Sequence, residues 1–299
     1  MLDLSIIIVT YNSENDIYPC LQSLILSNTK VNYEIIIVDN GSKDNTCKIV
    51  NNFILQNSNK KIKLIKGSNK GFNAGNNTGI NNSAGEFILL LNPDTEVFPN
   101  TLENLFNTSK KIKNMGSLGC VMVNKENQVI FSAGYFPSII SVIKKYIKKN
   151  QVRIHQNKEL QLVDFPAGST FMFRKSIITK IGLMDENYFL YFDETDYAYQ
   201  MKKVGLQSYI LTNTKVIHKF GQSTTNIPKF SIEKNIESFF YFINKNYNKF
   251  YGFLIKCFDL TFHLTRYSLS NIYKKHNKEL FKFYVQTYIL HFKRTIKNY

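Results

Sequence analysis

The sequence predicts an α/β fold in which helices flank a mostly parallel central sheet, followed by a helical C-terminal region. Short, continuous apolar runs at 4–9, 34–38 and 87–91 indicate strands that are buried on both faces. Between them, residues 15–26 and 45–53 show helical spacing, and residues 62–65 form a further strand-like segment. Strands that alternate with helices in this way are typical of βαβ units and a parallel sheet.

The second half of the chain predicts a mixture of strands and helices. We expect strands at 115–124 and 127–133, an amphipathic helix at 139–149, and a loop that enters a strand at 165–173, in which Gly168 permits close approach of another group. Two aromatic-rich helices are expected at 252–266 and 280–292. In the first of these, Gly252, Lys256, Asp259, His263 and Arg266 share one narrow polar stripe, so most of the remaining helix surface should be covered.

Charge and cysteine usage limit the class of protein. The 299 residues carry a net charge of +16, and from Thr225 onward thirteen Lys and Arg face four Asp and Glu. The four cysteines are far apart, which argues against a zinc site and a disulfide framework. No signal peptide or membrane span is expected, so we expect a cytoplasmic protein, with peripheral contact to the inner face of the plasma membrane as an open alternative. No nucleic-acid motif is present, and no nucleic-acid partner is expected.

Polar side chains follow the predicted strands at the point where each strand ends. Tyr11 follows the first, Asp39 the second, a Gly/Asn-rich loop at 69–77 the third, and Asn92-Pro93-Asp94 the fourth. Because the carboxyl ends of parallel strands lie along one edge of a sheet, these groups should converge on one cleft. Each could by itself be an ordinary turn. Together they favour a site in which the Asp94 carboxylate binds a divalent cation that carries phosphates.

An acidic cluster follows an aromatic run at 188–192 and contains Asp193, Glu194 and Asp196. Apolar surroundings raise the pKa of a carboxyl group and make its carboxylate a better base. Acidic residues also favour the first turn of a helix, where they cap it or interact with its dipole. The two interpretations are compatible, since a helix start would hold a catalytic carboxylate rigidly.

Four sequence blocks together resemble a known family. VTYN (9–12), VDNGSKDNT (38–46), NKGFNAGNNTGI (69–80) and LLLNPDTEV (89–97) look like the nucleotide-sugar half of family 2 glycosyltransferases, which have the GT-A fold. The chain is most similar to the rhamnosyltransferase-like branch of bacterial surface-polysaccharide enzymes, over residues 3–225. The resemblance implies a catalytic domain at 1–225, with a nucleotide-sugar half at about 1–115 and an acceptor half at about 116–225, and a basic helical region at 226–299.

The resemblance also implies a role for individual residues on the donor side. The uracil or thymine base would be held near Thr10, Tyr11, Asn12 and Asp39. The 69–77 loop, with Asn69, Lys70, Gly71 and Asn77, would lie near the base and the diphosphate. Asn92 would contact the ribose, Asp94 would bind a divalent cation (Mg or Mn), and His218 would complete the metal site unless it is structural. Lys219 could then neutralise phosphate.

On the acceptor side, the family motif of two adjacent acids, a spacer and an aspartate matches Asp193, Glu194 and Asp196. Its second acid is the base, which here is Glu194, with Asp193 as the alternative; Gln200 stands where relatives usually have an arginine. The implied activity is inverting, metal-dependent transfer of a sugar from a UDP- or dTDP-sugar to a hydroxyl of a glycan or lipid-linked glycan, in cell-surface polysaccharide synthesis.

Two alternatives to this activity remain open at the level of sequence. One is a non-catalytic sugar-nucleotide-binding protein, and the other is a nucleotide-dependent α/β enzyme such as a nucleotidyltransferase. The intact acids argue against the first, and the lack of a basic triphosphate loop after the first strand argues against the second. The C-terminal helices could pack on the catalytic domain, form a homo-oligomer or contact a membrane.

Overall fold

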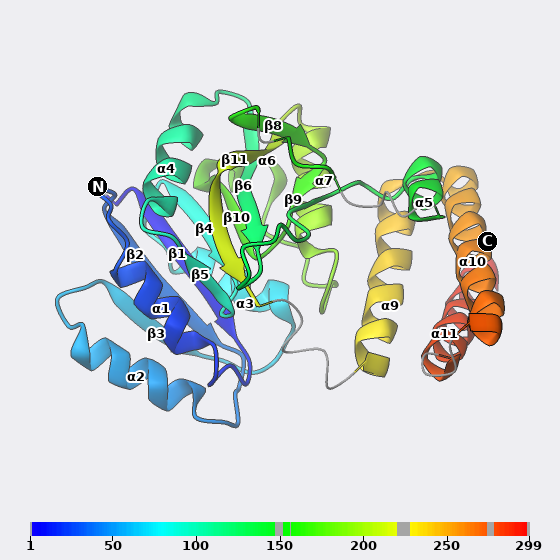
Figure 1. The fold of residues 1–299 in the computed structure, drawn as a ribbon, viewed down its shortest axis with the longest axis horizontal. Coiled ribbons are helices and arrows are strands. Elements are labelled where there is room, and N and C mark those ends of the chain that lie inside the picture. Colours follow the sequence, from blue (N-terminus) through cyan, green and yellow to red (C-terminus); the bar gives the residue numbers. More distant parts are fainter. Residues whose placement is uncertain (1, 147–151, 156, 220–227, 274–277, 298–299) are drawn as a thin grey trace. The chain divides into compact units, whose positions relative to one another are not determined.

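The computed structural model describes residues 2–146, 152–155, 157–219, 228–273 and 278–297, and the chain forms two compact units. The first unit comprises residues 1–134, 152–189 and 193–223. The second unit comprises residues 135–151, 190–192 and 224–299. Figure 1 shows that the first unit holds the sheet and that the second is helical.

The described part of the first unit contains a nine-stranded sheet in the order β3-β2-β1-β4-β10-β6-β11-β5, with β8 paired to β11. The strands are β1 (Leu4–Thr10), β2 (Tyr33–Asp39), β3 (Ile62–Lys66), β4 (Phe87–Leu91), β5 (Thr95–Val97), β6 (Met115–Val123), β8 (Leu160–Val163), β10 (Thr170–Arg174) and β11 (Gln207–His218). β1 pairs in parallel with β2 and β4, and β6 with β11, whereas β10 runs antiparallel between β4 and β6. A short ribbon, β7 (Ala133–Gly134) with β9 (Phe165–Pro166), lies outside this sheet. The predicted mostly parallel sheet is confirmed.

Helices cover both faces of the sheet because its strands are apolar on both sides. They are α1 (Ile17–Ile25), α2 (Thr46–Gln56), α3 (Phe72–Asn81), α4 (Thr101–Lys111), α6 (Ile178–Ile181), preceded by a 3-10 turn at Lys175–Ile177, and α7 (Asp193–Lys203). α1, α2 and α4 share a core with Ile6 and Ile8 on one face (Figure 1). α3 packs on the other face, where Gly79 lies directly against Ile7.

Three local predictions differ from the structure. Residues 69–77 were expected to form a loop, but α3 begins at Phe72, because Gly71 turns the chain with φ 105° and the following small and amide side chains fit against β1 and β2. Residues 127–133 were expected to form a strand, but they contribute only an isolated bridge at Val129 and the first residue of β7. The short strands β5 and β8 were not predicted.

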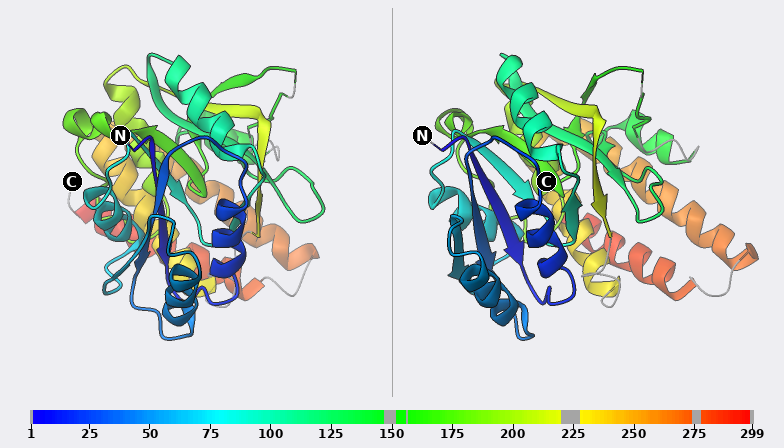
Figure 2. Two further views of the ribbon diagram at one scale, coloured as in Figure 1. Left: turned by 90° about the vertical axis from the view of Figure 1, so that its left-hand side faces the viewer. Right: turned by 60° about the vertical axis from the view of Figure 1, so that its left-hand side comes forward.

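The second unit consists of α5 (Ile139–Tyr146), α9 (Pro228–Asn246), α10 (Lys249–Tyr273) and α11 (Lys278–Lys297) in its described residues. α10 contacts the other three helices, and Figure 2 shows α10 and α11 side by side. The predicted C-terminal helices are therefore confirmed and are longer than expected. Residues 147–149 of the predicted helix at 139–149 lie outside the described residues. None of the described helices is long and apolar enough to span a bilayer.

The polar stripe predicted on α10 faces inward, which corrects the expectation that the apolar faces would be covered. Lys256 and Asp259 are each 1% exposed and His263 is 7% exposed, whereas several large apolar side chains of the same helix are exposed. Inside the unit, Lys256 donates a hydrogen bond to Asn244, and the His263 ring stacks on Tyr284 with centroids 3.9 Å apart.

Candidate active site

Asp39 closes the end of β2 with a complete set of local hydrogen bonds. Its Oδ1 accepts from Thr10 Oγ1 (3.0 Å) and Ser42 Oγ, and its Oδ2 accepts from the backbone N–H groups of Gly41 (3.1 Å) and Ser42 (3.0 Å). Burial by itself would raise the pKa of Asp39, but hydrogen bonds from Ser42, Cys47 and Thr10 outweigh it and hold the pKa below its ordinary value. Thr10, predicted to contact the base, is fully buried and positions this carboxylate.

Tyr11 and Asn12 form the neighbouring end of β1. The Tyr11 side chain is 44% exposed, so its ring is available as a flat surface at this edge. Asn12 has a positive φ of 50°, its N–H donates to Ser42 Oγ (2.9 Å), and its Oδ1 accepts from the Lys43 N–H (2.8 Å). Asn12 is exposed like Tyr11, but its backbone and side chain tie β1 to the turn after β2.

The predicted phosphate-proximal segment leads into α3. Asn69 and Lys70 are exposed, and Asn69 Oδ1 accepts from the Gly71 N–H (3.3 Å). Gly71 approaches Phe189 so closely that a Cβ would lie 3.0 Å from its Cα and carbonyl oxygen, and the Phe72 N–H donates to that carbonyl (2.9 Å). A side chain at position 71 would therefore separate the donor-side segment from the chain that leads to the acidic cluster.

Asn77, which was predicted to lie near the nucleotide, bonds to the segment at 184–186. Its Nδ2 donates to the Met184 carbonyl and to Glu186 Oε1 (2.8 Å each), and its Oδ1 accepts from the Met184 N–H (3.0 Å). These three bonds use the polar atoms of its amide. Asn73 holds the same segment through the Asp185 carbonyl (2.8 Å).

Asp94 and His218 meet just beyond the end of β4. β5 follows Asp94 directly and pairs antiparallel with β11, with His218 opposite Thr95. This pairing brings His218 Nε2 to 3.2 Å from Asp94 Oδ1, with both side chains largely buried. Asn92 Oδ1 is buried and accepts no hydrogen bond from the described residues. A buried acceptor without a donor is costly in a folded chain, so this amide oxygen is available to a water molecule or a ligand.

These three residues provide one carboxylate, one imidazole and one amide oxygen. Among the described residues, no group of three or more His, Cys, Asp or Glu is arranged to hold a metal ion. Mg²⁺ is usually bound through one or two protein carboxylates, with phosphate oxygens of the substrate as further ligands. The incomplete donor set at Asp94 therefore fits a cation that arrives with a diphosphate better than a permanently bound metal.

Lys219 lies beside Asp94, the candidate metal-binding residue. Its Nζ lies 2.9 Å from Asp16 Oδ1 and 3.8 Å from Glu96 Oε1, and its N–H donates to the Asp94 carbonyl (3.2 Å). Sequence reasoning expected this ammonium to neutralise phosphate, but two carboxylates already neutralise it. Asp16 and Glu96 were missed because pairs so distant in sequence carry no signal in a single chain.

The acid pair begins α7. Asp193 is 7% exposed and Glu194 is half-buried, and a Cβ on Gly168 would lie 3.5 Å from both Asp193 Oδ2 and Glu194 Cδ. Burial, and then the charge of Asp193, raise the pKa of Glu194 well above its ordinary value, and burial also raises the pKa of Asp193. The preceding Tyr191 and Phe192 have φ of 67° and 63°, a rare conformation for such side chains that is often found at functional sites.

Asp196 lies one turn further along α7 and has structural partners. Its Oδ1 accepts from Tyr188 OH (3.2 Å) and Gln200 Nε2 (3.1 Å), and the residue is 3% exposed. Gln200 thus donates to the final aspartate of the motif from the position where the family resemblance implied an arginine. Asp196 connects the aromatic segment to α7 and thereby fixes where the acid pair lies.

A short loop between β9 and β10 joins the two halves of the candidate site. Gly168 lies against the acid pair, and the next residue, Ser169, accepts a hydrogen bond from the Asn92 N–H through its carbonyl (3.3 Å). The loop passes beside the acid pair, but a Cβ on Gly168 would make only ordinary van der Waals contact with it, so this contact does not require the predicted close approach at a glycine.

Comparison with known proteins assigns this arrangement to a family. Residues 5–182, more than half of the chain, match glycosyl transferase family 2. The chain belongs to this family. The family of this glycosyltransferase was therefore correctly predicted from the four donor-side sequence blocks.

Curated relatives of the glycosyltransferase are distant. An N-acetylglucosaminyl-diphospho-decaprenol L-rhamnosyltransferase of Mycobacterium tuberculosis is 24% identical over 261 residues, which cover 80% of this chain and 83% of the relative. A low-salt glycan biosynthesis hexosyltransferase of Haloferax volcanii is 28% identical over 206 residues, covering 67% and 62% of the two chains.

Solved structures of glycosyltransferases share the fold. The mannosyltransferase PcManGT from Pyrobaculum calidifontis, in complex with GDP-Man and Mn²⁺, has a TM-score of 0.64 at 13% identity and covers 99% of this chain and 86% of its own. S. aureus TarS 1–349 has a TM-score of 0.58 at 17% identity, with 97% and 81% covered. The predicted GT-A fold is thereby confirmed.

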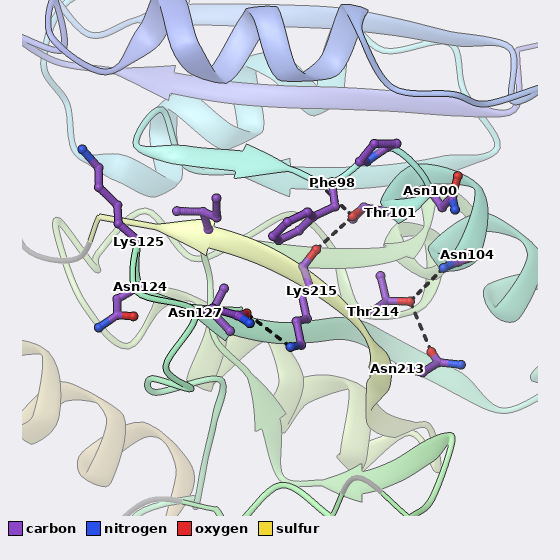
Figure 3. Close-up of a pocket in the computed structure, with 13 residues that line it drawn as sticks. Phe98, Asn100, Thr101, Asn104, Asn124, Lys125, Asn127, Asn213, Thr214 and Lys215 are labelled. Atoms are coloured by element: carbon purple, nitrogen blue, oxygen red, sulfur yellow. Dashed lines mark hydrogen bonds between the residues drawn. The ribbon is translucent and has the colours of Figure 1, made fainter.

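The glycosyltransferase also has a separate hollow of about 630 Å³ between the start of α4, β11 and the turn after β6 (Figure 3). Five of the thirteen residues that line it are asparagines. Figure 3 shows Lys215 bonded to Asn127 (3.2 Å) and Asn104 to Thr214 (3.1 Å). Ile217 lines the hollow, and since side chains alternate along a strand, the neighbouring His218 faces the other side. The hollow is therefore distinct from the candidate active site.

Proposed function

We propose that the protein is an inverting, metal-dependent hexosyltransferase that moves a sugar from a UDP- or dTDP-sugar to a hydroxyl of a glycan or lipid-linked glycan. The observation that carries this proposal is the loop at 167–169. One of its residues lies against the Asp193–Glu194 pair and the next bonds to Asn92, beside Asp94. A single displacement at a sugar carbon needs a general base for the attacking hydroxyl and a group that binds the departing diphosphate. The residues proposed for these two roles lie on two sides of one loop.

On the donor side, the residues would bind the nucleotide from base to diphosphate. The base would stack on the exposed Tyr11 ring and hydrogen-bond to Asp39, and the ribose would take the buried Asn92 Oδ1 as its acceptor. Asp94 and His218 would hold the divalent cation, which supplies positive charge opposite the departing diphosphate. The Mn²⁺ in the PcManGT complex supports a cation in this role.

On the acceptor side, Glu194 would take the proton from the attacking hydroxyl. Its raised pKa makes the carboxylate a stronger base, and the neighbouring Asp193 maintains that shift. In a single displacement the hydroxyl oxygen bonds to the anomeric carbon as the bond to the diphosphate oxygen breaks. The proton then resides on Glu194, and the configuration at that carbon is inverted.

The acceptor class follows from relatives rather than from a bound ligand. The M. tuberculosis relative is named for a lipid-linked N-acetylglucosaminyl-diphosphate, and the H. volcanii relative for glycan biosynthesis. Both names support a glycan or lipid-linked glycan acceptor and a place in polysaccharide synthesis for this chain.

A thermal-shift panel of UDP- and dTDP-sugars with and without Mn²⁺ tests the donor half of the proposal. We expect one donor class to raise the melting temperature, and Mn²⁺ to increase that shift. Asp94→Ala should abolish the Mn²⁺-dependent part, since it removes the carboxylate of the donor set, while Glu126→Ala, at an exposed carboxylate in the turn after β6, should not. An Asp94→Ala protein that binds nucleotide with the same metal dependence would refute the assignment.

Turnover tests the catalytic half. With the preferred donor and a glycan acceptor, the configuration of the new glycosidic bond, followed by NMR, should be opposite to that of the donor. Donor binding without transfer to any acceptor in a glycan panel would instead indicate a non-catalytic sugar-nucleotide-binding protein.

A further inference from the structure

The outward face of α10 is uncharged over most of its length. Between Phe250 and Leu269 the exposed side chains comprise five large apolar residues, three hydroxyl residues and one charged residue: Phe250, Phe253, Phe258, Thr261, Leu264, Thr265, Arg266, Ser268 and Leu269. At 3.6 residues per turn, the eight uncharged ones fall within an arc of about 160°, and Arg266 falls outside it. We call these eight residues the apolar face of α10.

Two of the three hydroxyl groups on this face are satisfied within the helix. Thr261 Oγ1 donates to the Cys257 carbonyl (2.9 Å), and Thr265 Oγ1 donates to the Thr261 carbonyl (2.8 Å). A hydroxyl that bonds to the carbonyl four residues earlier needs no water. The apolar face can therefore leave water without losing hydrogen bonds at these two positions.

The charged side of α10 lies in the interior of the second unit, so the helix is inverted relative to a helix of an ordinary soluble domain. Lys256, Asp259 and His263 are buried. Burial lowers the pKa of Lys256 to about 8. The Lys256 carbonyl also accepts from Tyr288 OH on α11 (3.0 Å). Polar groups that bond to one another inside, with apolar groups outside, suit a helix whose outer face meets hydrocarbon rather than water.

The region around the apolar face is basic. From Thr225 to the end, the chain has thirteen Lys and Arg residues and four Asp and Glu residues. Lys249 directly precedes Phe250 and is exposed, as is Lys245 near the end of α9, and α11 exposes Lys282, Lys293 and Arg294. α5, in the same unit, exposes Ile140 (67%) and Ile143 (46%) beside Lys144. Apolar side chains bordered by lysines match the chemistry of an anionic lipid surface.

We propose that the apolar face of α10 is a membrane-docking surface that lies in the plane of an anionic lipid leaflet. From Phe250 to Leu269 the helix is about 28 Å long, and no described helix could cross a bilayer, so docking is lateral. Phenylalanine and leucine side chains enter the acyl boundary, and the surrounding lysines contact the lipid phosphates. This surface does not depend on the transfer chemistry, so its test can fail or succeed independently of the proposed function.

The chain has no tryptophan, which gives a clean test of this surface. A single tryptophan in place of Phe258, at 42% exposure, reports on the environment of the apolar face with little change in size. Leu55→Trp, at 75% exposure on α2, is the matched control in the first unit. Each variant is titrated with vesicles of phosphatidylglycerol and phosphatidylcholine, and with vesicles of phosphatidylcholine alone.

We expect the fluorescence of Phe258→Trp to shift to shorter wavelength with phosphatidylglycerol vesicles and to be quenched by brominated acyl chains, while Leu55→Trp shows neither change. Removing phosphatidylglycerol or adding high salt should weaken partitioning at least tenfold, because screening weakens the contacts of lysine with phosphate. In flotation, a triple variant with glutamate at Phe253, Phe258 and Leu264 should float at least tenfold less than wild type. Thr265→Glu should also reduce flotation, and it removes no apolar packing.

Three results would overturn the proposal. One is a Phe258→Trp spectrum that vesicles leave unchanged. Another is equal flotation of wild type and the correctly folded glutamate variants, judged by melting temperature. The third is a blue shift that occurs without lipid, increases with protein concentration and is lost where sedimentation shows no dimer. This result would make a second copy of the chain the occupant of the face.

Discussion

Replacing Glu194 with glutamine separates the chemistry of the acid pair from its contribution to stability. Glutamine preserves the size of the side chain and removes its ability to accept a proton. A positioned general base contributes typically 10²–10⁴-fold to a rate. We therefore expect Glu194→Gln to lose about 10²–10⁴ in kcat, with donor affinity unchanged because the residues proposed to bind the nucleotide lie on other elements.

The same change should stabilise the folded protein at alkaline pH. The position that a Cβ on Gly168 would occupy lies 3.5 Å from Asp193 Oδ2 and 3.5 Å from Glu194 Cδ. The two carboxylates are therefore at most about 7 Å apart, and their charges repel by about 2 kcal/mol at an effective dielectric constant of 20. Because the folded-state pKa of Glu194 is raised, wild type loses stability as pH rises through that pKa, and the variant does not. The gain corresponds to a rise of about 5 °C in Tm.

The assays are steady-state transfer with the preferred donor and thermal melts from acidic to alkaline pH. Glu126→Gln, at an exposed carboxylate of the same unit, is the control for loss of a charge. Wild-type turnover in Glu194→Gln would refute the assignment of the base. A variant that melts below wild type at alkaline pH would refute the argument that the pair is electrostatically strained.

Two further predictions concern neighbouring features. Asp193→Asn removes the charge that helps to raise the pKa of Glu194, so the acidic limb of the pH profile of kcat/KM should move to lower pH; an unchanged limb would contradict this coupling. Gly79→Ala places a Cβ in overlap with Ile7 Cγ2, and this overpacking, about 1–3 kcal/mol, should exceed the gain of about 1 kcal/mol in helix propensity. Urea unfolding should show a net loss of stability, whereas Gly67→Ala, 3.5 Å from its nearest neighbour, should be tolerated.

The parallel part of the sheet was predictable because its strands are buried on both faces and so appear as unbroken apolar runs. β10 was predicted as a strand, but its antiparallel direction depends on contacts far along the chain. β5 is three residues long and exists because β11 pairs with it, so no local pattern could reveal it. α3 was missed for a different reason: its sequence, FNAGNNTGIN, is poor in helix formers, and tertiary packing against β1 stabilises it.

The roles of the candidate site residues stay predictions, and the groups that contact them could not be predicted from the sequence. Asp94, Glu194 and Gly168 belong to motifs that lie together in sequence and were predicted individually. The groups that orient them come from elsewhere, as Lys219 shows by pairing with Asp16 about two hundred residues away. The inward direction of the polar stripe on α10 was also invisible, because periodicity shows that a stripe exists but not which side of it is covered.

If Asp39 binds the base as proposed, its closed hydrogen-bond set would make recognition an exchange of hydrogen bonds rather than an addition. The carboxylate accepts four hydrogen bonds from Thr10, Gly41 and Ser42 and a further one from the Cys47 thiol, so a ring N–H of a pyrimidine would have to displace one of them, such as that of the Ser42 hydroxyl. The number of hydrogen bonds would then stay the same, and the free energy of binding would come from the proposed stacking on Tyr11 and from the diphosphate. Such a site would select among bases without holding any of them tightly, which would favour rapid release of the spent nucleotide once the diphosphate contacts loosen.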